Sequence, residues 1–233
     1  MNKEFLNNQL KQLNVNVDDV VIDRLCFLEE NLLAWNKNVN LTAITDSEEI
    51  ATKHFADSLS VLPYAEFQEG ATLIDVGCGA GFPSLPLLIA RPDLKVTFLD
   101  SIGKKLNFIE DTVNKLELDG TIIHDRAEMI GKDEDYRETF DFAVTRAVAP
   151  LNVLAEYCLP LVKVGGMYIS MKGAEDEVEL GENAINTLGG KIEQVVSFKL
   201  PNGDKRNLIM IKKISQTPTG YPRKAKKIDT RPL

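Results

Sequence analysis

The segment 72–83, Thr-Leu-Ile-Asp-Val-Gly-Cys-Gly-Ala-Gly-Phe-Pro, constrains the fold of this chain more than any other segment. An apolar run leads into Asp75, glycines 77, 79 and 81 alternate with small residues, and an apolar helix-like segment follows. This order predicts a strand, a tight turn and a helix start. Glycine permits positive φ and close approach of a ligand, and a helix N-terminus presents unpaired N–H groups. The segment therefore indicates a ligand-binding turn, or a turn that serves only the geometry of an α/β fold.

Beyond residue 72, strand-length and helix-length patterns alternate, which is typical of a parallel sheet. The expected strands are 72–76, 95–100, 120–124, 140–145, 165–171, 192–199 and 206–213. The expected helices between them are 83–90, 103–117, 150–162 and 174–188. The last two strands are joined by 201–204, Pro-Asn-Gly-Asp, which suits a hairpin turn. The sequence thus predicts an α/β fold with a seven-stranded, mostly parallel sheet, an antiparallel last strand and helices on both faces.

The residues before this pattern are expected to form a helical extension. Apolar residues recur at steps of three or four between Val21 and Trp35, which places them on one face of a helix expected over 10–35. A second helix is expected from a cap at Asp46 or Ser47 to about residue 62. We accordingly divide the chain into an N-terminal helical extension (1–66), a cofactor-binding domain (67–216) and a basic, irregular C-terminal segment (217–233).

Polar residues at the predicted ends of further strands favour a nucleotide-like ligand. Asp100 ends the strand 95–100, where a carboxylate can accept hydrogen bonds from ribose hydroxyls. Ala127 and Glu128 follow the third strand, and Arg146 ends the fourth with a planar charged fork. The ordinary alternatives are a helix cap for Asp100, a surface acid for Glu128, and a salt bridge from Arg146 to Glu128 or another acid.

The glycine spacing distinguishes two cofactors. Dinucleotide-binding proteins use G-x-G-x-x-G, whereas this chain has G-x-G-x-G, which resembles motif I of the class I S-adenosylmethionine (SAM) methyltransferases. The two histidines, His54 and His124, and the three widely spaced cysteines predict neither a metal site nor a disulfide framework. Each histidine is expected to pack or cap.

The net charge of −8 hides an asymmetry along the chain. Residues 199–233 hold ten basic and two acidic residues, a net charge of +8, which leaves −16 on residues 1–198. Such asymmetry indicates a segment that binds a polyanion, or else a solvated segment with no partner. The sequence has no long apolar run and no signal-peptide pattern, so we expect a cytoplasmic protein without a membrane partner.

Motifs in order along nearly the whole chain resemble those of the bacterial 16S rRNA guanine-N7 methyltransferases, the glucose-inhibited division protein B family. The motifs are Asn40-Leu41-Thr42-Ala43, Lys53-His54-Phe55-Ala56-Asp57-Ser58-Leu59, Asp75 to Pro83, Asp100-Ser101 with Lys104-Lys105, Arg126-Ala127-Glu128, Thr145-Arg146-Ala147-Val148-Ala149, Lys172-Gly173 and Tyr221-Pro222-Arg223-Lys224. Cys78, Ser84 and Thr145 depart from the residues usual in that family, and none of these departures removes a charged group.

The resemblance implies SAM-dependent methylation of N7 of a guanine in the 530 loop of 16S rRNA, by a monomer that acts on rRNA or the small ribosomal subunit. It implies SAM contacts from Gly77, Phe82, Ala127, Glu128 and Arg146; motif I adds Asp75, Gly79 and Gly81, and the strand-end argument adds Asp100. The candidates for substrate binding are Arg146, Lys172, Arg223 and Lys224.

Guanine N7 has an in-plane lone pair and no proton, so its methylation requires no general base. Positioning of the acceptor can supply most of the catalysis, and Arg146 is the one candidate for a catalytic role. Two other functions stay open at this point. One is an NAD(P)-binding oxidoreductase, and the other is a non-catalytic SAM-binding interaction protein linked to cell division.

Overall fold

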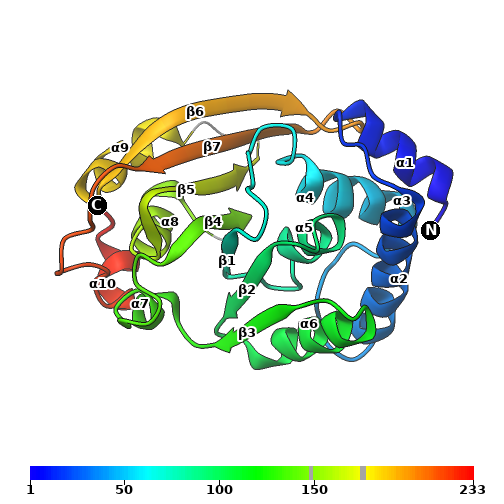
Figure 1. The fold of residues 1–233 in the computed structure, drawn as a ribbon, viewed down its shortest axis with the longest axis horizontal. Coiled ribbons are helices and arrows are strands. Elements are labelled where there is room, and N and C mark those ends of the chain that lie inside the picture. Colours follow the sequence, from blue (N-terminus) through cyan, green and yellow to red (C-terminus); the bar gives the residue numbers. More distant parts are fainter. Residues whose placement is uncertain (147–148, 174–176) are drawn as a thin grey trace.

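The computed structural model describes residues 1–146, 149–173 and 177–233. Over these residues seven strands form one sheet in the order β3-β2-β1-β4-β5-β7-β6 (Figure 1). They are β1 (Thr72–Val76), β2 (Lys95–Asp100), β3 (Gly120–His124), β4 (Phe140–Arg146), β5 (Val162–Lys172), β6 (Gly190–Lys199) and β7 (Lys205–Lys213). Strand β7 is antiparallel to β5 and β6, and the other neighbours pair in parallel. The predicted sheet, including its antiparallel last strand, is confirmed.

Both faces of the sheet are buried, as the prediction of helices on both faces requires. Alternate strand residues point to opposite faces. Leu73 joins the hydrophobic cluster formed with α2 (Asp19–Asn36), α5 (Ser84–Ala90) and α6 (Gly103–Lys115). Its neighbour Ile74 joins the second cluster, with α8 (Leu151–Cys158) and α9 (Val178–Thr187). The strand order reverses between β1 and β4, where doubly wound folds bind ligands at the carboxyl ends of the strands.

The single helix predicted over 10–35 is two helices, α1 (Lys3–Gln12) and α2. The chain turns between them at Asn14, whose φ of 58° lies in the left-handed region, and the Asp18 side chain accepts a hydrogen bond from Val21 N at 2.9 Å. A side-chain cap begins a new helix there. The apolar periodicity does mark a buried face, because Leu25, Leu28 and Leu32 are fully buried.

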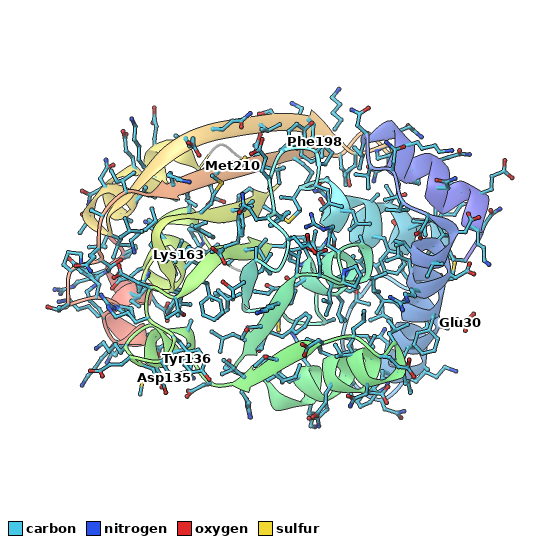
Figure 2. All side chains as sticks on the ribbon, viewed as in Figure 1. Glu30, Asp135, Tyr136, Lys163, Phe198 and Met210 are labelled. Carbon is cyan, nitrogen blue, oxygen red and sulfur yellow. The ribbon has the colours of Figure 1, made fainter. Side chains whose placement is uncertain are left out.

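The second predicted helix contains a widened turn. Asp46 caps α3 (Ser47–Glu49), as expected, by accepting from Glu48 N and Glu49 N. The chain continues through the π-helix η1 (Ile50–Ala56) into α4 (Asp57–Leu59). Single π-turns are rare and are frequent at functional sites, and this one carries His54. The end of β6 that carries Phe198 lies beside this region (Figure 2). Phe198 packs on Tyr64, which follows α4, with ring centroids 6.2 Å apart.

We expected residues 217–233 to be irregular. This prediction is wrong for one stretch, because the helix α10 (Ala225–Thr230) forms there. Ile228 of α10 is fully buried, and the Arg137 guanidinium donates to the carbonyl oxygens of Thr217 and Tyr221 at 2.7 and 2.8 Å. These tertiary contacts supply the order that the sequence pattern lacks. The short helix α7 (Ala127–Ile130) was also missed. Residues 174–176, the predicted start of α9, lie outside the described residues.

Candidate functional site

A cavity of about 810 Å³ lies at the carboxyl ends of the strands. Val76, Leu99 and Arg146 line it from the ends of β1, β2 and β4. The loop before α3 and η1 contribute a further wall that includes Thr42 and His54, although these residues are distant in sequence from the strand ends. Such a largely concave site with mixed apolar and polar walls is the usual form of a small-molecule site.

The glycines of the turn have different tasks. Gly79 has a φ of 56°, and a Cβ added there would meet only Lys105 Nζ, at 4.0 Å, so the space above this residue is open for a ligand. A Cβ on Gly81 would lie 2.4 Å from Leu85 Cδ1, so this glycine permits close packing of turn and helix. Gly77 and Gly79 line the cavity, whereas Gly81 lies outside the described lining.

The two acidic residues of the predicted site have different surroundings. Asp100 lines the cavity and accepts hydrogen bonds from Gly79 N and Ile102 N, both at 2.8 Å. It therefore holds the turn against the end of β2. Asp75 is fully buried beneath the turn, outside the described lining, and accepts from Ser84 N at 3.3 Å. Burial raises the pKa of Asp75 to about 7, against the hydrogen bond from Ser84 N.

The helix α7, which begins at the predicted site residues Ala127 and Glu128, forms another wall of the cavity. Ala127 and Glu128 line the cavity at the start of this helix, and the apolar side chain of Ile102 lines it as well. Glu128 is 9% exposed, so it is not the surface acid considered as an alternative. Tyr157 of α8 completes this wall.

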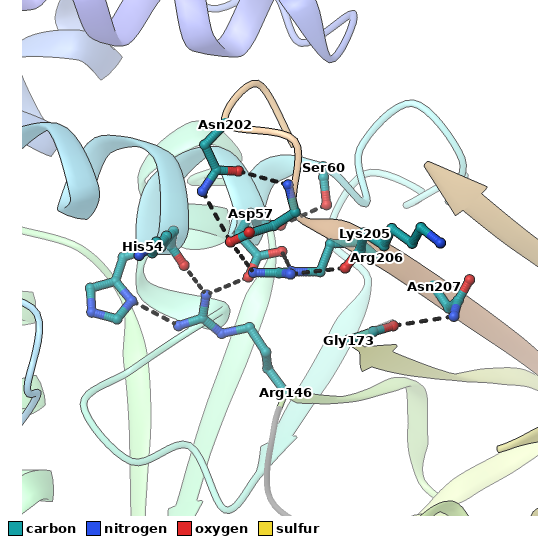
Figure 3. A network of polar contacts seen from close by, with 11 residues as sticks. His54, Asp57, Ser60, Arg146, Gly173, Asn202, Lys205, Arg206 and Asn207 are labelled. Carbon is teal, nitrogen blue, oxygen red and sulfur yellow. Dashed lines mark hydrogen bonds and ion pairs between the residues drawn. The ribbon is translucent and has the colours of Figure 1, made fainter. Parts of the chain in front are cut away.

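Arg146 lies at the centre of a polar network that crosses from the sheet to η1 (Figure 3). Its NH1 group donates to Lys53 O at 2.9 Å and to Asp57 Oδ2 at 3.1 Å, and its NH2 group donates to His54 Nδ1 at 3.2 Å. The guanidinium carbon is 5.2 Å from the centre of the Phe82 ring. The predicted salt-bridge alternative is therefore present, with Asp57 rather than Glu128 as the acid.

Asp57 joins a second arginine to this network. Its Oδ1 atom accepts from Arg206 Nε at 3.0 Å, and Arg206 also lines the cavity. The Asp57 side chain is 7% exposed, and those of Arg146 and Arg206 are 13% and 20% exposed. A buried carboxylate thus lies between two arginines at one end of the cavity.

The predicted substrate-binding residues are divided between the cavity and other parts of the molecule. Lys172 lines the cavity, donates to Ala149 O and pairs with Glu177 at 2.9 Å. Arg223 pairs with the fully buried Glu156 at 2.5 Å, outside the described lining. Lys224 is exposed on the same segment.

Sequence reasoning assigned no ligand-facing role to Thr42, His54, Asp57 or Arg206, which all line the cavity. The signal available for the first three was their place in two motifs of the N-terminal extension. Arg206 gave no signal, because it reaches Asp57 across 149 residues of sequence.

A protein-family model described as rRNA small subunit methyltransferase G matches residues 22–209. The chain is 51% identical over 222 residues to the ribosomal RNA small subunit methyltransferase G of Acetivibrio thermocellus, a match that covers 94% of this chain and 91% of the relative. It is 46% identical over 226 residues to the protein of that name from Alkaliphilus metalliredigens, with 95% of each covered.

Solved structures show the same fold at lower identity. A SAM-dependent methyltransferase from Aquifex aeolicus matches with a TM-score of 0.52 and 23% identity, over 71% of this chain and 93% of that one. A geranyl diphosphate methyltransferase in complex with SAM matches with a TM-score of 0.55 and 14% identity, over 68% of this chain and 85% of that one. Neither the oxidoreductase nor the non-catalytic interaction protein considered above finds support in these matches.

Proposed function

The chain belongs to the rRNA small subunit methyltransferase G family, and on that premise we propose that it transfers the methyl group of SAM to N7 of a guanine in the 530 loop of 16S rRNA. The observation that carries this proposal is the cavity at the reversal of strand order. There the turn of motif I, the end of β2, α7 and Arg146 face one space.

The described residues fit SAM. The open side of Gly79 gives a ligand access to the main chain. The Asp100 carboxylate lines the cavity, and each of its oxygens has a lone pair left after its one backbone hydrogen bond, so it can accept from ribose hydroxyls. Phe82, Ile102 and Ala127 supply apolar walls. We assign Gly77, Gly79, Phe82, Asp100, Ala127, Glu128 and Arg146 to SAM binding, and Asp75 and Gly81 to the support of the turn.

When bound, SAM supplies an electrophilic methyl group on a positively charged sulfur. The acceptor N7 of guanine carries a lone pair and no proton, so the protein has no proton to remove. The task of the cavity residues is to hold the acceptor in line with the methyl group, which lowers the entropic part of the barrier. Arg146 serves that task with a charged fork suited to a carboxylate or to a base edge.

The proposed macromolecular partner is 16S rRNA, free or within the small ribosomal subunit, and the proposed acting form is a cytoplasmic monomer. Basic side chains line the cavity, including Lys53, Lys105, Arg126 and Arg206. Cationic side chains attract and position the phosphates of RNA. No helix in the described ranges is both long and apolar enough to cross a membrane.

Nucleoside mass spectrometry of the 530-loop fragment tests the proposal. A strain without the gene should lack 7-methylguanosine in this fragment, and the wild-type gene should restore it. A Gly77→Asp gene should not restore it. Gly77 lines the cavity and has a φ of 73°, a backbone conformation that is strained for a residue with a side chain. An unchanged level of 7-methylguanosine in the deletion strain would overturn the proposal. Titration of the purified protein with SAM and with NADH checks the cofactor independently.

A further inference from the structure

We propose that His54 is a positioning residue for Arg146: a neutral imidazole whose Nδ1 lone pair accepts from the guanidinium and fixes its orientation in the cavity. The inference deepens the proposed methyl transfer and rests on it for the role of Arg146. It starts from the 3.2 Å contact between Arg146 NH2 and His54 Nδ1. The two residues come from different elements, β4 and η1, so their contact joins the sheet to the N-terminal extension.

The tautomer of His54 follows from its two partners. Arginine has N–H donors and no acceptor, so Nδ1 must be the unprotonated nitrogen. In the neutral ring the proton then lies on Nε2, which is 2.9 Å from Thr42 Oγ1. That hydroxyl oxygen also accepts from Ile44 N at 3.1 Å. A main-chain N–H thus holds Thr42, Thr42 accepts from His54, and His54 accepts from Arg146.

The position of the imidazole is fixed by stacking and burial. Its ring lies 4.4 Å from the Phe82 ring at an interplanar angle of 9°, and the residue is 8% exposed. Phe82 also lies beside the Arg146 guanidinium, at 5.2 Å. Burial, and next the positive charge of Arg146, lower the pKa of His54 to about 3. A protonated ring would lose the lone pair that the arginine requires.

The network leaves Arg146 able to bind a ligand. The group has five N–H donors, and three are used by the acceptors on Lys53, Asp57 and His54. Two N–H donors of Arg146 therefore have no partner among the described contacts and remain for a ligand. Without the His54 acceptor, the guanidinium would be held through NH1 alone, and its NH2 group would lose the contact that fixes it.

Two substitutions separate positioning from simple packing. His54→Phe keeps a ring against Phe82 and removes the acceptor, whereas His54→Asn removes the ring and places an amide oxygen near the Nδ1 position. We expect His54→Phe to weaken SAM binding or to lower kcat by about tenfold, and His54→Asn to recover to within about threefold of the wild type. Equal loss in both variants, better function in His54→Phe, or no loss in either would overturn the proposal. Thermal melting of each variant reports any loss of folded protein.

Nitrogen-15 NMR gives a second readout that depends on no RNA. The chain has two histidines, so a His124→Gln variant leaves His54 as the single imidazole. His124 lies outside the described lining of the cavity. We expect the neutral Nε2–H tautomer from about pH 5 to about pH 8. The Nδ1–H tautomer, or a charged ring near pH 6, would overturn the positioning role. If the NMR result and SAM titration agree with the proposal while 530-loop methylation is absent, the acceptor assignment fails and the positioning role stands.

Discussion

At the scale of single residues, Asp57 is the acid that pairs with both Arg146 and Arg206 at the cavity. It is buried and pairs with Arg146 at 3.1 Å and with Arg206 at 3.0 Å. Removal of a buried acid leaves its cationic partners desolvated and unpaired, which costs far more than the loss of a surface pair. The residue is thus expected to stabilise the fold and to hold Arg146 in place.

Asp57→Ala should lower the free energy of unfolding by about 3 kcal/mol, since two largely buried guanidinium groups lose their common acid. Urea denaturation measures this change. Asp204→Ala is the matched control, because Asp204 is 45% exposed and lies 4.0 Å from the same Arg206. The control should change stability by less than about 0.5 kcal/mol. Equal effects of the two substitutions would contradict the role given to Asp57.

Asp75 should make the free energy of unfolding fall as pH rises, which is opposite to the effect of an Asp whose pKa is lowered by folding. Burial raises its pKa in the folded protein to about 7, whereas an unfolded Asp titrates near about pH 3.9. Between these values the folded state binds the proton and the unfolded state does not, so stability falls as pH rises. Relative to Asp75→Asn, the wild type should lose on the order of 4 kcal/mol between about pH 4 and pH 7. Parallel stability curves for the two proteins would refute this.

At the scale of elements, the sequence predicted those strands and turns whose formation depends on residues close together in the chain. The strand before Gly77, the acid at the end of β2 and the β6–β7 hairpin follow from apolar runs, glycine and turn residues, and each is confirmed. The π-turn of η1 and the helix α10 lack such signals, because burial of His54 and Ile228 against distant parts of the chain stabilises them. The site divides in the same way: Gly79 and Asp100 were predicted, whereas the cavity-facing roles of His54 and Arg206 depend on tertiary contacts.

The C-terminal segment 217–233, expected from its charge to bind a polyanion, also has a structural role. Arg223 donates to Glu156 from both its main chain and its guanidinium, at 2.5 to 3.0 Å, and Glu156 is fully buried. The next residue on α8, Tyr157, lines the cavity and donates to Asp229 of α10 at 3.2 Å. The segment therefore stabilises the position of α8, which contributes to one wall of the cavity.

Arg223→Ala should destabilise the fold by about 3 kcal/mol, because it leaves the Glu156 carboxylate buried without its cation. It should also weaken SAM binding through Tyr157. Lys224→Ala, one residue later and exposed, should do neither. Denaturation and SAM titration of both variants measure these effects. If Arg223→Ala keeps wild-type stability and loses only RNA affinity, its assignment as a substrate-binding residue is preferred over the anchoring role.

At the scale of the whole molecule, the basic residues of 199–233 lie on two parts of the fold, the strands β6 and β7 and the segment that carries α10. The basic helix α10 lies at the end of the molecule opposite α1 and α2 (Figure 1). Lys224, Lys226 and Lys227 are exposed there, and α8 connects this end to the cavity through Tyr157. Arg223 is engaged with Glu156, so these three lysines are the better candidates for contacts with RNA phosphates.

Replacement of Lys224, Lys226 and Lys227 by Gln should therefore weaken RNA binding with little effect on SAM binding. For each phosphate that the variant no longer binds, the slope of log K against log salt concentration should become shallower by about 0.7 to 0.9. The matched control replaces Lys3, Lys11 and Lys37 by Gln, which removes the same charge from exposed positions on or beside α1 and α2. Because the two triple variants have equal net charge, a larger change of slope in the first locates the RNA-binding surface on α10. Equal slopes would show that only the total charge of the protein matters, and would remove α10 from the proposed interface.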